Sequence, residues 1–179
     1  MRTRLPRPVV VVAFLALAAC APRADGPTAP PPPTTFAATN AQSWLDIIQP
    51  YRAELLEASA GLLYTSESDY PFDYVSRPVF LRDTLTLATF RTAFFISPTT
   101  PVAVRSLDRF FARHIELVDP GDPLSTALVP RYENLKFQLQ ELLNAPKAYC
   151  VGTVQLRCYV VGTSPEGVIG GLATTSIET

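Results

Sequence analysis

The residues of this chain best suited to chemistry are three acidic side chains that lie close together, Glu67, Asp69 and Asp73. They fall in and just after the stretch GLLYTSESDYPF, residues 61–72, whose serines and aspartate favour a turn. Burying a carboxylate costs free energy, so a short polar turn directs such groups outward. There they suit contact with a cation, a metal ion or a basic cleft.

The same turn also has a purely structural interpretation. The side chains of Ser66, Ser68 and Asp69 can hydrogen-bond nearby backbone groups, with residues 70–72 packed underneath. A third interpretation is a hydrolytic pair formed by Asp69 and Glu67, although paired acids on a turn are more often solvated. The residue types alone leave these alternatives open.

Other catalytic patterns are not found in the sequence. The one histidine, His114, lies in a helical pattern beside Phe110 and Phe111. Without a second residue of catalytic type it is expected to be a surface or half-packed residue rather than a general base. The glycines form no phosphate-binding loop. We therefore expect a protein that is not an enzyme, with no cofactor and no metal site of its own.

Two cysteines near the C-terminus suggest a cross-link. If residues 148–151 pair with 157–160 around a turn near Val154, Cys150 and Cys158 face each other across the strands. Oxidising conditions outside the cytoplasm would favour a disulfide between them. Two small buried cysteines that never bond are the alternative.

The first twenty residues have the composition of an export signal. Three arginines within the first seven residues precede an apolar run, 9–18, and a small-residue site that ends in Cys20. This pattern resembles the lipobox of bacterial lipoproteins, which implies removal of residues 1–19 and a lipid on Cys20. Ala21 after the cysteine favours an outer membrane, facing the periplasm. An ordinary secretory signal and an uncleaved anchor are the alternatives.

The rest of the chain divides into a tether and one domain. Residues 20–40 are rich in proline, alanine and threonine, which favour extended polyproline II. Twenty such residues reach at most about 60 Å. Residues 41–179 have the length of a single domain with one core.

The net charge of the chain limits the class of partner that it can bind. The chain has fifteen basic and sixteen acidic residues, and removing the three signal arginines leaves twelve basic ones. This negative balance disfavours direct nucleic-acid binding, which needs a basic face. It suits docking onto a basic cleft of a protein partner.

Hydrophobic periodicity predicts alternating helices and strands. The first three predicted helices are 41–63, with Pro50 at the start of its main part or at a kink, 84–95, and 107–114 capped by Ser106 or Asp108. A loop at 118–125 precedes a second long helix, which is indicated by apolar residues from Tyr132 to Leu143 and stops before Pro146. The predicted strands are 74–81, 102–106, 148–151, 155–162 and 168–177. Segment 84–95 also fits a strand, but we favour a helix. The order fits an α/β sandwich with a mixed or largely antiparallel sheet and a C-terminal meander.

Several blocks resemble a known family. Residues 54–73, ELLEASAGLLYTSESDYPFD, are similar to the segment that marks the nuclease A inhibitor family. The resemblance resumes in VRSLDRFF at 104–111 and in YVVGTSPEGVIGGLATTSIET at 159–179, and it is loosest over 74–103. It implies an inhibitor that plugs the active site of a sugar-non-specific DNA/RNA endonuclease. It also implies a three-layer α/β/α sandwich similar to the PR-1 proteins.

The resemblance assigns roles to individual residues. It implies that Glu67 reaches into the metal-bearing centre of a secreted or periplasmic nuclease, with Ser66, Ser68 and Asp69 around it. It implies that the terminal carboxylate at Thr179 approaches the same centre. The remaining alternative is a non-inhibitory envelope lipoprotein, a structural or adaptor module that keeps the fold without the target.

Overall fold

A computed structural model describes residues 36–178, with side chains from Trp44 onward. The signal, Cys20, most of the tether and Thr179 lie outside the described residues. Within the described part, the helices are α1 (Phe36–Ser59), α2 (Leu87–Ala93), α3 (Leu107–Ile115) and α4 (Pro123–Leu142). The strands are β1 (Leu63–Thr65), β2 (Asp69–Pro71), β3 (Asp73–Phe80), β4 (Val102–Arg105), β5 (Asn144–Val151), β6 (Gln155–Thr163) and β7 (Val168–Ile177). These elements belong to one compact unit.

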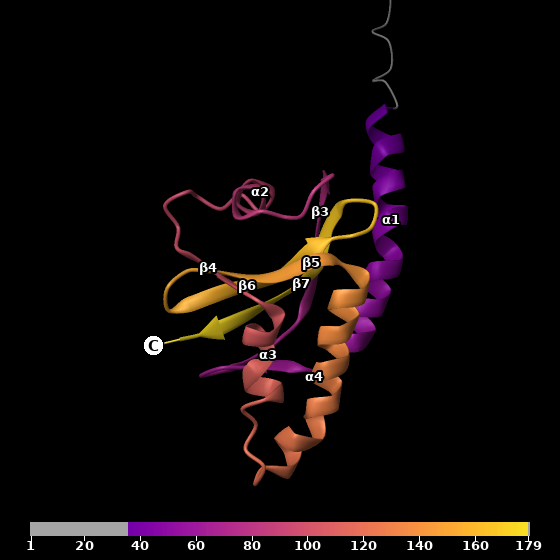
Figure 1. Cartoon of the computed structure of the whole chain (residues 1–179). Helices are drawn as coiled ribbons and strands as arrows, with labels where there is room; N and C mark the ends of the chain where they lie inside the picture. Colours follow the sequence, from indigo (N-terminus) through magenta and orange to yellow (C-terminus); the bar gives the residue numbers. More distant parts are fainter. Residues whose placement is uncertain (1–35, 179) are drawn as a thin grey trace, which may run out of the picture. The chain divides into compact units, whose positions relative to one another are not determined.

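The main sheet has the strand order β3-β7-β6-β5-β4, and each neighbouring pair is antiparallel (Figure 1). β5, β6 and β7 follow one another in the sequence and form the predicted C-terminal meander. β7 spans the predicted residues 168–177, and β6 extends the prediction by one residue. β1 and β2 form a separate two-stranded hairpin. The prediction of a largely antiparallel sheet is confirmed.

Helices cover both faces of this sheet. α1, α3 and α4 pack on one face through buried residues that include Leu55, Phe110, Phe111, Leu135 and Leu139. α2 covers the other face, where Phe90 and Phe94 meet Tyr149, Val161 and Ile169. Figure 1 shows α2 across the sheet from α3 and α4. Burial of each large apolar side chain contributes about 1.5–3 kcal/mol, so both layers stabilise the predicted α/β/α sandwich.

Capping residues decide where α3 and α4 begin. The Ser106 side chain accepts a hydrogen bond from the backbone N–H of Arg109 at 3.2 Å, so the predicted cap of α3 is confirmed. Asp122 caps α4 in the same way, and Pro123 fills the first helical position. α4 therefore begins at Pro123, inside the stretch 118–125 that we predicted to be a loop.

α1 differs from the prediction at both ends. It begins at Phe36, so residues 36–40, which were assigned to the tether, are helical. It ends at Ser59 rather than at residue 63, because Gly61 adopts a left-handed conformation with φ of 69°. Leu62 then turns into the core as a buried residue. Among the described residues, no helix is long and apolar enough to cross a membrane.

The bounds of α2 and β5 also differ from the prediction. α2 is shorter than the predicted 84–95, because Thr86 caps it and Phe95 leaves the helical conformation with φ of 57°. β5 begins at Asn144 and takes in Pro146, although the prediction started this strand at residue 148. The register of β5 against β6 shifts between Asn144 and Lys147, which accommodates the proline.

Candidate functional site

The predicted acidic turn forms the tip of a hairpin between β1 and β2. β1 and β2 pair with Thr65 opposite Asp69, so residues 66–68 form the tip. Tyr64 of β1 is buried and fixes the base of the hairpin to the core. Glu67 and Asp69 are exposed. The hairpin therefore presents Glu67 outward from a paired and anchored backbone.

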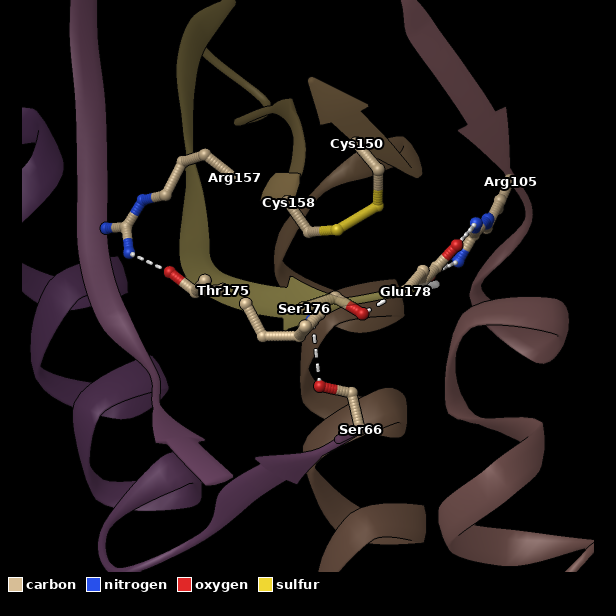
Figure 2. The surroundings of a disulfide bond; sticks show 9 residues. Ser66, Arg105, Cys150, Arg157, Cys158, Thr175, Ser176 and Glu178 are labelled. Atoms are coloured by element: carbon tan, nitrogen blue, oxygen red, sulfur yellow. Dashed lines mark hydrogen bonds and ion pairs between the residues drawn. A yellow bond between two sulfur atoms is a disulfide. The ribbon is translucent and has the colours of Figure 1, made fainter. Parts of the chain in front are cut away.

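Ser66 attaches this tip to the end of the main sheet. Its Oγ accepts a hydrogen bond from the backbone N–H of Ile177 at 2.9 Å (Figure 2). The same hydroxyl donates to the carbonyl oxygen of Ser68 at 3.1 Å, and the Ser66 N–H donates to that oxygen at 3.2 Å. Ile177 is the last residue of β7. The tip and the C-terminal end of the sheet are thus held side by side.

Glu178, which follows β7, is also firmly held. Arg105 at the end of β4 donates from Nη1 and Nη2 to its two carboxylate oxygens, each at 2.9 Å (Figure 2). The Ser176 hydroxyl donates to the same carboxylate at 3.2 Å, and the Glu178 N–H donates to Val154 O at 2.9 Å. The hydrogen bonds from Arg105 hold the pKa of Glu178 below its usual range. Glu178 is therefore a charged and oriented group next to the hairpin.

Three arginines lie beside the tip, and they were not predicted from the sequence. An open depression of about 360 Å³ is lined by Glu67, Arg105, Arg109, Arg113, Ile177 and Glu178. Arg109 and Arg113 lie four residues apart in α3, so they share one face of that helix. The expected acidic surface is therefore a surface of mixed charge. It can contact cationic groups through carboxylates and anionic groups through guanidinium donors.

The other two carboxylates of the acidic stretch do not join Glu67 in one cluster. Asp73 begins β3 and pairs with Arg157 of β6 at 2.9 Å. Asp69 lies on β2, opposite Thr65. In the part of the chain that the structure describes, no three His, Cys, Asp or Glu side chains are grouped to hold a metal ion. Glu67 alone of these three acids lines the depression beside the end of β7.

His114 is buried, whereas we expected a surface or half-packed residue. Only 6% of it is exposed, and its ring lies between Tyr64 of the hairpin and Tyr132 of α4, at centroid distances of 5.0 and 4.5 Å. The Tyr132 hydroxyl donates to the carbonyl oxygen of Leu63 at 2.6 Å. Burial, with the nearby charge of Arg113, lowers the pKa of His114 to about 4. The imidazole is thus a neutral packing group beneath the hairpin.

Cys150 and Cys158 are joined in a disulfide. They lie directly opposite each other on β5 and β6, with a Cα–Cα distance of 3.9 Å. On the chain-entropy estimate, closing so short a loop stabilises the fold by about 2.5 kcal/mol. Cys150 lies opposite Ala103 of β4, two residues before Arg105 (Figure 2 shows the bond and Arg105). The cross-link therefore strengthens the sheet next to the hairpin tip.

Comparison with known proteins supports a family assignment. A family model described as nuclease A inhibitor-like protein matches residues 49–179. The match takes in the hairpin, α3 and the strands that end beside the tip. No curated protein matches the chain.

Proposed function

Because the chain belongs to the nuclease A inhibitor-like family, we propose that it inhibits a metal-dependent endonuclease that cleaves both DNA and RNA. The β1–β2 tip enters the active site of the nuclease and excludes substrate. One observation carries this proposal: Glu67 is exposed at the apex of a hairpin that Ser66 ties to the end of β7.

The chemistry of the tip fits such a target. A nuclease site that holds a phosphodiester beside a divalent cation offers a hard metal ion and Lys or Arg donors. A carboxylate oxygen can take the place of a phosphate oxygen toward both. The inhibitor needs only a rigid presentation of its acid, because ordering a loose loop on binding would weaken affinity. The hydrogen bonds of Ser66 supply that rigidity.

Thr179 is proposed as a second contact with the same centre. It lies outside the described residues, but Glu178 directly before it lines the same depression as Glu67. The place of Glu178 beside Glu67 supports a shared target for the tip and the residues that follow β7.

The test is a titration of a purified DNA/RNA-non-specific endonuclease with the protein in Mg²⁺ buffer. Glu67→Ala is expected to weaken inhibition by about 2 kcal/mol or more, roughly thirtyfold, because it removes a carboxylate from the centre of the interface. Asp69→Ala should cost less. Glu133→Ala removes an exposed acid from α4 and serves as the control. Equal inhibition by the wild type and by Glu67→Ala would reject the proposed site.

We also propose that Cys20 carries lipid and that the protein is anchored in the cell envelope, as the pattern Leu17-Ala18-Ala19-Cys20 suggests. Cys20→Ser should leave an unprocessed or soluble species, because the lipidated thiol is lost. Membrane fractionation and mass spectrometry of the mature N-terminus check this. An unmodified Cys20 in the mature wild-type protein would contradict the proposal.

A further inference from the structure

Hydrogen bonds and one peptide link connect β4 to the hairpin tip (Figure 2). Arg105 holds both carboxylate oxygens of Glu178, and the preceding residue, Ile177, donates its N–H to the hydroxyl of Ser66. Ser66 is followed by Glu67. Each step joins neighbouring residues or a hydrogen-bonded pair, so the orientation of the tip is linked to Arg105.

We propose that Arg105 is a positioning residue for the inhibitory tip. By holding Glu178 it keeps the N–H of Ile177 on Ser66 Oγ, and this fixes the backbone that carries Glu67. The inference rests on the proposed function, and it assigns to Arg105 an indirect effect on inhibition through the position of Glu67.

The strength and place of the contact support this role. A guanidinium that donates twice to one carboxylate forms a charge-assisted pair of fixed geometry. The Arg105 and Glu178 side chains are 26% and 38% exposed, so water screens the pair only in part. The hairpin belongs to a separate two-stranded sheet and is not continuous with the main sheet. Its tip therefore depends on such side-chain contacts for order.

The loss of Arg105 should weaken inhibition without unfolding the domain. Arg105→Met keeps most of the length of the side chain but cannot bind Glu178, and we expect about fivefold weaker inhibition from the cost of ordering the tip. Arg157→Met is the matched control, because it breaks the Arg157–Asp73 pair on the same sheet, at the same N–O distance of 2.9 Å. The control should inhibit within twofold of the wild type. Equal inhibition by Arg105→Met and the wild type would overturn the proposal.

A double-mutant cycle separates positioning from direct contact with the nuclease. When Glu67 is already alanine, Arg105→Met should cause little further loss, because the group that it positions is gone. An equal loss in both backgrounds would show that Arg105 acts independently of Glu67. That result would also overturn the proposal.

A measurement without any nuclease tests the same path. Amide hydrogen exchange in the compact unit, residues 35–179, should become faster at Ile177 in Arg105→Met, whereas the central strand β6 keeps its protection. Glu178→Gln, which removes only the charge, should give the same pattern if Arg105→Met folds poorly. Unchanged exchange at Ile177 in a folded variant would refute the path. If the wild type inhibits no such nuclease, the proposed function fails, while the exchange result still decides the role of Arg105 in ordering the tip.

Discussion

Lowering the pH from 7.5 to 5 is expected to remove about 2 kcal/mol from the free energy of unfolding, because the folded protein holds His114 neutral. The folded pKa of about 4 lies below the ordinary value of 6.5. As the pH falls through 6.5, the unfolded chain takes up a proton that the folded protein does not. Stability is therefore complete above pH 6.5 and declines down to about pH 4, with a total loss of about 3 kcal/mol from this residue.

His114→Phe provides the control for this effect. Phenylalanine keeps an aromatic ring between Tyr64 and Tyr132 but takes up no proton, so its stability should stay nearly constant between pH 7.5 and 5. Urea unfolding at several pH values measures the difference. The window stops at pH 5 because carboxylates such as Glu178, whose pKa is lowered in the fold, add their own loss under more acidic conditions. The same pH slope in both proteins would show that His114 is not the group responsible.

Gly171→Ala should prevent stable folding, with a loss of about 4 kcal/mol or more. Gly171 lies in β7 with φ of 151°, a conformation that favours glycine. An added Cβ would lie 2.1 Å from the carbonyl oxygen of Val160 and 2.9 Å from the Cα of Val161. Both atoms belong to the backbone of β6, in the centre of the sheet, so the clash cannot be relieved by rotating a side chain.

The neighbouring glycine gives a matched comparison. An alanine at Gly170 would meet the hydroxyl of the Tyr74 side chain at 3.3 Å, and that side chain can shift. We expect Gly170→Ala to cost about 1 kcal/mol, close to the ordinary loss for a point substitution. Circular dichroism and thermal unfolding of the two variants test the difference. A folded Gly171→Ala of nearly normal stability would contradict the backbone geometry of β7.

The sequence was sufficient to predict the elements that carry strong local signals. The cap at Ser106 located the start of α3, and β7 occupies the predicted residues 168–177. The end of α1 was misplaced because Leu62 and Leu63 continue the apolar spacing. A local conformation at Gly61 overrides that spacing. Periodicity reports which residues are apolar, and it does not report where the backbone turns.

The candidate site was predictable only in part, since long-range contacts create most of it. Glu67 and Ser66 were expected from the acidic stretch and the family resemblance. Arg105 and Glu178 come together only when β4 and β7 have joined the same sheet. His114 could have been recognised as a core residue, because it lies on the same apolar face of α3 as Phe110 and Phe111. Because its side chain is polar, we expected it at the surface or half packed.

The attachment of Ser66 to Ile177 has a consequence for the order of folding. These residues are 111 positions apart in the chain, and Arg105 is 73 positions from Glu178. Contacts of such high sequence separation form late, because the chain loses the entropy of a long loop before the new contact stabilises it. A nascent chain that has not yet released β7 from the ribosome can pair β1 with β2, but Ser66 then lacks the N–H of Ile177 that ties the tip to the main sheet. The binding site is therefore completed only after β7 has emerged and joined the sheet.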